Sequence, residues 1–336
     1  MNGWTAKDMQ DQSGRVIVIT GSNSGVGYES AVAFAQKGAR VVMACRSLDK
    51  AEGARQELLK RAPNARVDIL PLDLGSLESV HRFAATLNAS YDRLDILMNN
   101  AGIMAPPYGK TTDGFETQFG TNHLGHFALT GLLLRKLLET AHSRIVTVSS
   151  SAYLLGCIHF DDLQSEKRYS ATAAYSQSKL SNMLFGQELQ RKFDAVRAEV
   201  ISVISQPGYA ITNLQKEQTG IMNYTFYPLL KWAMSQPADL GATYQLYAAA
   251  APDARGGDYY EPRWVLRGKV VHGKVNARGR DAADAARLWQ VSEQLTGVHY
   301  ELLEKTSSHP RVRCLIRGIG DHQRKRIDCA AAFTLK

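Results

Sequence analysis

The sequence is poor in cysteine, and its cysteines are scattered. Four occur among 336 residues, at Cys45, Cys157, Cys314 and Cys329, and no two have the Cys-x-x-Cys spacing. Closely spaced cysteines are typical of zinc sites and of small disulfide-stapled folds, so the sequence favours neither class. We expect free thiols in a reducing compartment and no bound metal.

Long apolar runs are also missing. No stretch approaches the roughly 18 apolar residues that a membrane-spanning helix requires. The first ten residues, MNGWTAKDMQ, lack a basic segment followed by an apolar core, which is the pattern of a secretory signal. We therefore expect a cytoplasmic protein with no integral membrane segment.

Charge is unbalanced only at the C-terminal end. The chain has a net charge of +8, but residues 305–336 hold eight Lys and Arg against two Asp, a net of +6. The remaining chain is then close to balanced, and a terminal excess is typical of a solvated tail. We expect no nucleic-acid binding, and we assign residues 301–336 to a basic C-terminal tail of unknown role.

What the sequence does contain is an apolar run followed by a glycine-rich turn. Residues 16–19 predict a buried strand, and a helical segment at 28–36 follows the turn. Such a turn lets backbone N–H groups approach a phosphate, and the helix dipole favours its charge. The Gly-x3-Gly-x-Gly spacing differs from the common dinucleotide fingerprint, so a tight turn without a ligand stays open. The candidate phosphate-binding residues are Gly21, Ser22, Asn23, Ser24, Gly25, Val26 and Gly27.

Strand and helix patterns alternate along the rest of the chain. This order predicts one α/β fold, a Rossmann-type doubly wound parallel sheet with helices on both faces. No linker precedes about residue 300, so we expect one domain over residues 1–300. Predicted strands cover 40–44, 67–70, 94–98, 144–149, 199–204 and 257–260, the last being the final strand. Predicted helices cover 49–61, 76–87, 113–139, 172–193, 238–251 and 281–296.

Ligands of such sheets bind beyond the carboxyl ends of the strands. After the second strand Arg46 stands where NAD enzymes usually have an acidic residue, and it could pair with the 2′-phosphate of NADP, assisted by Ser47 or Lys50. A solvated surface arginine is the alternative. Asp73, followed by Leu74, could accept from the adenine amino group or cap the next helix. Asn100, Ala101 and Gly102 are small enough for a cofactor to lie against their backbone.

The chemistry is expected after the fifth strand. Tyr175 and Lys179 are four residues apart, so they share one face of the predicted helix. A nearby ammonium and a positively charged nicotinamide would lower the pKa of the phenol. Tyr175 could then give a proton to a carbonyl as hydride arrives, while Ser150 hydrogen-bonds the developing oxyanion.

These motifs together resemble the short-chain dehydrogenase/reductase family. The resemblance rests on TGSNSGVG (20–27), NNAG (99–102), VSS (148–150) and YSQSK (175–179), which stand in the family's order. It implies that Asn122 is a fourth catalytic residue, which holds a water linking Lys179 to solvent. The family register makes Ser150, and not its neighbours Ser149 and Ser151, the catalytic serine.

A closer resemblance is to the retinol dehydrogenase-like branch, with the light-dependent protochlorophyllide reductases as relatives. The segments VMACR (42–46), TNHLGHF (121–127), FDDL (160–163) and AAYSQSKLSNMLF (173–185) carry it. NADP preference in this branch agrees with Arg46. The NNAGIMAPP segment (99–107) resembles the retinol-type enzymes more than the reductases.

Substrate contacts are expected after the sixth strand. Pro207, Gly208 and Thr212 resemble the family's P-G-x-x-x-T, which implies contact with the nicotinamide carboxamide. Residues 221–234 are rich in large apolar side chains and predict a helix covering a pocket for a bulky lipophilic substrate. A core helix, a homodimer face and peripheral membrane contact are the alternatives.

Three functions therefore stand as hypotheses. The first is an NADP(H)-dependent oxidoreductase acting on a lipophilic alcohol or carbonyl, such as a retinal-like or steroid-like compound. The second is a light-dependent reductase of a C=C bond in a tetrapyrrole. The third is a non-catalytic NADP-sensing protein on the same fold, since fold alone does not give function.

Overall fold

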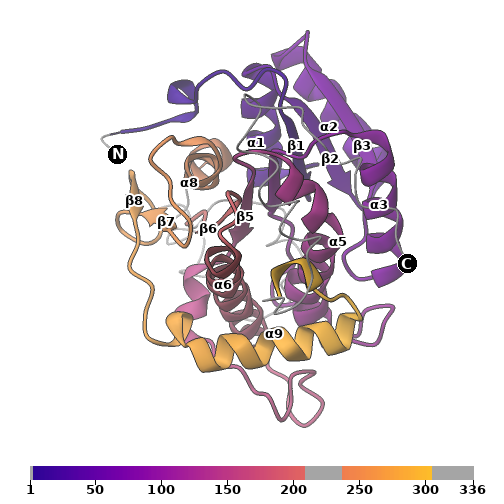
Figure 1. Ribbon diagram of the computed structural model, residues 1–336, viewed down its shortest axis with the longest axis vertical. Coiled ribbons are helices and arrows are strands. Elements are labelled where there is room, and N and C mark those ends of the chain that lie inside the picture. Colours follow the sequence, from indigo (N-terminus) through magenta and orange to yellow (C-terminus); the bar gives the residue numbers. More distant parts are fainter. Residues whose placement is uncertain (1–2, 209–236, 305–336) are drawn as a thin grey trace, which may run out of the picture.

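A single eight-stranded sheet forms the centre of the molecule (Figure 1). The computed structural model describes residues 3–208 and 237–304. The strand order is β3-β2-β1-β4-β5-β6-β7-β8, the doubly wound order, and the predicted fold class is confirmed. The strands are β1 (Val16–Thr20), β2 (Arg40–Cys45), β3 (Arg66–Pro71), β4 (Ile96–Asn99), β5 (Arg144–Val148), β6 (Ile201–Ser205), β7 (Tyr259–Pro262) and β8 (Val270–His272).

The last strand departs from the expectation. The strand predicted at 257–260 is β7, which pairs parallel to β6, but β8 follows it and pairs antiparallel to β7. The prediction that the sheet ends at Tyr260 is therefore wrong. The β8 strand has only three residues, too few for a period-two pattern to be detected in the sequence.

Helices cover both faces of the sheet (Figure 1). Helices α1 and α8 pack together on one face, with α2 beside α1, while α3 and α5 pack on the other, with α6 and α9 beside them. The long helices are α1 (Gly25–Gln36), α2 (Leu48–Arg61), α3 (Leu77–Ser90), α5 (Gly125–Glu139), α6 (Ala171–Val196), α8 (Ala238–Ala250) and α9 (Ala282–Thr296). Short elements are η1 (Ala6–Asp8), α4 (Thr117–Phe119), η2 (Gly120–Leu124), η3 (Ser151–Leu155), η6 (Arg278–Arg280) and η7 (Glu301–Leu303).

Alternate residues of β1 point to opposite faces of the sheet. Ile17 and Ile19 belong to the core beneath α1 and α8, whereas Val16 and Val18 belong to the core beneath α3 and α5. All five residues of β1 are buried. The unbroken apolar run in the sequence is thus the signature of a central strand covered on both sides.

The helix predicted over 113–139 contains a π-helical turn and starts later than predicted. It consists of α4, a π-helical turn η2 and α5, and it begins only after Glu116. Gly114 has a φ of +86°, which ends any helix there, and the Glu116 carboxylate caps α4 by accepting from the backbone N–H groups of Gln118 and Phe119. The chain is thus helical throughout 117–139, and the prediction places the start of the helix four residues too early.

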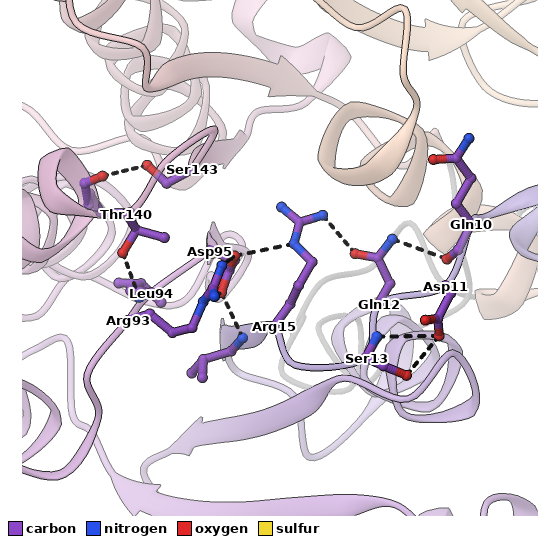
Figure 2. Close-up of polar contacts among 12 residues, drawn as sticks. Gln10, Asp11, Gln12, Ser13, Arg15, Arg93, Leu94, Asp95, Thr140 and Ser143 are labelled. Carbon is purple, nitrogen blue, oxygen red and sulfur yellow. Dashed lines mark hydrogen bonds and ion pairs between the residues drawn. The ribbon is translucent and has the colours of Figure 1, made fainter. Parts of the chain in front are cut away.

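The amino ends of the central strands are tied together by Asp95 (Figure 2). Its side chain is 2% exposed, and its carboxylate accepts from the Val16 backbone N–H at 2.9 Å. It also accepts from the guanidinium groups of Arg93, at 2.7 and 2.8 Å, and of Arg15, at 3.3 Å. This cluster fixes the start of β4 beside the start of β1, at the end of the sheet away from the glycine-rich turn.

The packed chain continues past α9, which ends before Gly297 as its sequence predicts. Leu303 is 3% exposed and belongs to the core that contains Phe127 and Trp289. Thr212, the apolar segment 221–234 and the basic segment from residue 305 onward lie outside the described residues. The expectations placed on them stay predictions.

Candidate active site

The turn after β1 is a cradle built from glycine. Gly21 and Gly25 have φ values of +65° and +58°, in the left-handed region that favours glycine. A Cβ on Gly27 would lie 2.4 Å from Asn100 Nδ2 and 2.7 Å from the Gly21 carbonyl oxygen, so no side chain fits there. Helix α1 starts within the turn, at Gly25, three residues earlier than predicted, and its Ser24 cap makes no side-chain capping bond. The N–H groups in the first turn of α1, and the close approach that the glycine backbone allows, fit a dinucleotide phosphate.

Ser22, one of the predicted phosphate-binding residues, turns its side chain into the protein. Its hydroxyl donates to the Ile19 carbonyl at 3.0 Å and lies 3.7 Å from Cys45 Sγ. Burial raises the pKa of the Cys45 thiol. Ser22 therefore braces the ends of β1 and β2, and only its backbone remains for a ligand.

Beside the turn lies an open pocket of about 540 Å³, between the starts of α1 and α2. Lys50 is the basic side chain that lines it, whereas Arg46 is exposed and stands outside the lining. Arg46 makes no ion pair with any residue of the described ranges 3–208 and 237–304. The full lining is Asn23, Ser24, Tyr28, Lys50, Gly53, Ala54 and Glu57.

Asp73 and Leu74 follow β3, as predicted. The Asp73 carboxylate accepts from the Gly75 N–H at 2.9 Å, which closes a turn, and the Asp73 N–H donates to Ser79 Oγ at 3.0 Å. Ser76 caps α3, so Asp73 does not serve as the helix cap. Leu74 is buried, and its carbonyl oxygen would meet a Cβ at Gly125.

The residues after β4 are bound to the end of β1. Thr20 Oγ1 accepts from the backbone N–H groups of Asn100 and Ala101, both at 2.9 Å. Asn100 Nδ2 donates in turn to the Thr20 carbonyl at 2.8 Å. The two predicted cofactor motifs thus form one structural unit, at the carboxyl ends of adjacent strands.

Asn122 lies in the π-helical turn η2, and its side chain is fully buried. Its amide accepts from the Ile103 N–H at 2.8 Å, and donates to the Ile103 carbonyl at 3.0 Å and to Ser178 Oγ at 2.9 Å. Its backbone carbonyl accepts from His126 Nδ1 at 2.9 Å. A Cβ on Gly102 would come within 3.2 Å of Asn122 Oδ1 and 3.4 Å of Lys179 Nζ. Asn122, Gly102 and Lys179 therefore meet.

Tyr175 is in the second turn of α6 and is half-buried. Ser150, which caps η3 after β5, lies beside it, and Lys179 Nζ is 5.7 Å from the centre of the Tyr175 ring. The structure thus brings together the four residues predicted to be catalytic. They come from three separate segments, the start of η3, the π-helical turn η2 and helix α6.

Burial shifts the pKa values of both Tyr175 and Lys179. Burial raises the pKa of Tyr175, and the neighbouring Ser150 hydroxyl lowers it by less. Burial lowers the pKa of Lys179 to about 8, and its ammonium donates to the Val148 carbonyl at 3.2 Å. The predicted lowering of the Tyr175 pKa is not given by the protein's own groups, because desolvation outweighs them.

The backbone carrying Lys179 is fixed from β5. Ser149 Oγ donates to the Lys179 carbonyl at 2.8 Å, and Asn182 Nδ2 donates to the Val148 carbonyl at 3.2 Å. Ser149 therefore holds helix α6, which leaves Ser150 as the serine beside Tyr175. Ser151 donates its N–H to Gln206 at 2.9 Å.

After β6 the chain continues through Gln206, Pro207 and Gly208, the last two of which are half-buried. Gln206 is buried and joins the segment after β5 to the β7–β8 hairpin, since its amide also donates to the Glu261 carboxylate and the Val265 carbonyl. The described part of the chain contains no group of three or more side chains that could hold a metal.

With this geometry in place, comparison with known proteins identifies the family. A family model described as short chain dehydrogenase matches residues 15–220, the span that holds the glycine-rich turn and all four clustered residues. The chain belongs to the short chain dehydrogenase family. These proteins are oxidoreductases that bind a nicotinamide cofactor, and the cradle after β1 fits that group.

Within the short chain dehydrogenases, the chain is similar to retinol dehydrogenases. It is 40% identical to mouse retinol dehydrogenase 12 over 297 residues, covering 86% of this chain and 88% of that protein. It is 41% identical to human retinol dehydrogenase 11 over 287 residues, with coverage of 85% and 86%. The predicted resemblance to this branch is confirmed.

Solved structures agree with the assignment. An uncharacterised protein from Mycobacterium paratuberculosis shares 42% identity and superposes with a TM-score of 0.75, covering 89% of this chain and 99% of that one. Pseudomonas aeruginosa RhlG, solved as a complex with NADP, shares 21% identity, with a TM-score of 0.60 and coverage of 74% and 94%. At this low identity, the similarity to RhlG shows only that the two proteins share a fold.

Sequence reasoning missed several side chains that surround this short chain dehydrogenase site. Ser178 and His126 hold Asn122, and Tyr28 and Glu57 line the pocket. Each stands three or four residues from a predicted site residue or on a neighbouring helix. Helical spacing was therefore the available signal for Ser178, His126 and Tyr28, but not for Glu57.

Proposed function

We propose that the protein is an NADP(H)-dependent oxidoreductase that interconverts a lipophilic alcohol and its carbonyl compound. The observation that carries the proposal is the cluster of Tyr175, Ser150, Lys179 and Asn122 beside the residues that follow β1 and β4. Tyr175 is the general acid in the reductive direction and the general base in the oxidative direction.

Bound NADP(H) would supply or accept the hydride, held by the glycine-rich turn, the residues after β3 and β4, and Pro207 and Gly208. The remaining roles belong to side chains of this chain. Tyr175 passes its hydroxyl proton to the carbonyl oxygen, and Ser150 hydrogen-bonds that oxygen as its charge develops. The Lys179 ammonium stabilises the phenolate that remains. Asn122, as the family resemblance implies, would hold the relay water through which Lys179 exchanges protons with solvent.

The preference for NADP over NAD is supported by basic side chains after β2. Lys50 lines the pocket between α1 and α2, Arg46 precedes it by four residues, and no carboxylate follows β2 directly. Arginine and lysine both bind phosphate, the arginine through a planar fork and the lysine as a point charge. Both are available for a 2′-phosphate.

The substrate class is supported by the relatives, which are named as retinol dehydrogenases. A bulky lipophilic alcohol or carbonyl fits this likeness. The described part of the chain contains no helix that is long and apolar enough to span a membrane. Cys45 and Cys157 are free thiols, which is consistent with the cytoplasmic location that the sequence predicts.

The test is NADPH consumption in the dark with purified protein and a panel of aldehydes and ketones that includes retinal and a steroid ketone. NADH is run in parallel. We expect turnover with NADPH and at least tenfold less efficient turnover with NADH, since a 2′-phosphate contact is a charge-assisted bond.

The variant Tyr175→Phe tests whether Tyr175 is the general acid. Loss of the general acid should lower kcat by roughly 10²-fold or more, while the Kd for NADPH, measured by fluorescence, stays unchanged. Undiminished kcat in this variant would refute the assigned role. NADPH binding without turnover of any carbonyl, or turnover of a tetrapyrrole only under illumination, would favour the other two hypotheses.

A further inference from the structure

The backbone that follows Gly102 borders the cluster around Tyr175. Residues 103–106 leave the end of β4 beside Lys179 and Asn122, and all four are half-buried. Ala105 has a φ of +53°, a left-handed conformation that costs energy for any residue with a Cβ. Something must therefore hold this loop in place.

Two side chains from neighbouring turns of helix supply the first contacts. Asn122 pairs with both the N–H and the carbonyl of Ile103. Gln118, four residues earlier, accepts from the Ala105 N–H at 2.8 Å. The strained residue is thus fixed through its own backbone amide, and the loop follows the surface of α4 and η2.

Tyr169 holds the loop from the other side. We call Gln118 and Tyr169 together the clamp. Its hydroxyl donates to the Pro106 carbonyl at 2.6 Å and accepts from Gln118 Nε2 at 3.2 Å. Gln118 Nε2 also donates to the Ala171 carbonyl at 3.0 Å, in the first turn of α6. Tyr175 lies one helical turn beyond Ala171, so the clamp joins the loop to the start of the helix that carries Tyr175.

The Gln118 side of the clamp lies in the interior of the protein. Gln118 is fully buried, and the Glu116 carboxylate, also fully buried, accepts from its N–H at 3.0 Å. Every polar atom of the Gln118 side chain has a partner: the Oε1 atom bonds Ala105, and Nε2 bonds Tyr169 and Ala171. A buried glutamine with all bonds satisfied fixes one geometry of the groups around it.

We infer that Tyr169 and Gln118 are positioning residues that fix loop 103–106 as a wall of the substrate site, and thereby determine how bulky a carbonyl compound the site accepts. The inference rests on the proposed function. It assigns the loop to the substrate side because a Cβ on Gly102, at its start, would lie 3.4 Å from Lys179 Nζ, while Tyr169, which bonds Pro106 at its end, precedes α6 by two residues.

The test is Tyr169→Phe, which removes one hydroxyl and keeps the ring. We expect KM for a bulky carbonyl, retinal or a steroid ketone, to rise about five- to tenfold, the equivalent of one lost hydrogen bond. For a short aliphatic aldehyde, KM should stay within about twofold, as should kcat for both substrates and the Kd for NADPH. A merely structural role would not separate bulky from short substrates.

The matched control is Tyr108→Phe. The Tyr108 ring packs edge-on against Tyr169 at 5.1 Å, and its side chain is 43% exposed, so the variant removes a hydroxyl from the same aromatic pair without touching the clamp. Its KM values should equal those of the wild type. Equal KM values in Tyr169→Phe and the wild type, or equal increases for bulky and short substrates, would overturn the inference.

Hydrogen exchange provides a readout that does not need turnover. The Ala105 amide should exchange at least about fivefold faster in Tyr169→Phe than in the wild type, with the Tyr108→Phe rate unchanged. If the wild type reduces no carbonyl compound, the proposed function fails, and the exchange rates still decide whether the clamp holds the loop. Unchanged exchange would refute the clamp by itself.

Discussion

Two basic residues that follow β2, Arg46 and Lys50, are candidates for binding the 2′-phosphate of NADP. The sequence points first to Arg46, because it directly follows β2 and has the planar fork suited to a phosphate. The structure places Lys50 in the pocket lining and leaves Arg46 exposed outside it. Which of two basic residues faces a pocket depends on the direction of the helix start, and the spacing in the sequence does not give this direction.

The contribution of Lys50 can be measured directly. In Lys50→Ala, KM for NADPH should rise about tenfold, since a charge-assisted bond to the 2′-phosphate is lost, while KM for NADH should not change. Lys7→Ala removes an equal charge from an exposed position in η1 and serves as the control. An equal rise of both KM values would show that Lys50 acts on the fold of the pocket and not on the phosphate.

Elements were predicted well where their pattern is long. The β1, β2 and β5 strands and helices α2, α6 and α9 lie within a few residues of their predicted bounds. The prediction failed at β8, because three residues carry no period. It also missed the π-helical turn η2 within a predicted helix, because such a turn changes no residue pattern. Asn122 lies in that turn. The family motif identified Asn122 as a site residue. Its contacts with Ile103 could come only from the structure.

We expect the Asp95 cluster to stabilise the central sheet. Asp95→Ala removes the partner of the Val16 N–H and of two guanidinium groups, so the free energy of unfolding should fall by roughly 2 kcal/mol, measured by urea denaturation. Asp92→Ala, at an exposed position three residues earlier, should change it by less than about 0.5 kcal/mol.

The activity of Asp95→Ala at a temperature where it is folded should equal that of the wild type. The carboxylate lies at the amino ends of the strands, whereas the clustered site residues lie at the carboxyl ends. A loss of kcat without a loss of stability would show that the two ends of the sheet are coupled.

Within the described ranges 3–208 and 237–304, His123 and His126 are buried in neutral form. Burial lowers the pKa of His123 to about 3 and of His126 to about 4, from the usual 6.5. Below pH 6.5 the unfolded chain binds protons at these positions, and the folded chain does not until the pH falls to its own lowered pKa. The free energy of unfolding must therefore decrease as the pH falls from 6.5 to about 4.

At pH 5 the expected loss is about 2 kcal/mol for each histidine relative to pH 7.5, measured by denaturant unfolding at both pH values. The His123→Gln variant should lose less stability between these pH values than the wild type does. His81→Gln, at an exposed position, is the control. Identical pH dependence in all three proteins would contradict the assignment of the loss to buried His123.

The two outer strands of the sheet bear on how copies of the chain behave at high concentration. An edge strand exposes unpaired backbone groups and can recruit another chain into a growing sheet. At one edge β3 carries Arg66, Asp68 and Pro71, and at the other β8 is only three residues long and lies against the direction of β7. Charge, proline and a short reversed strand each oppose strand addition, so the folded protein resists fibre formation through either edge.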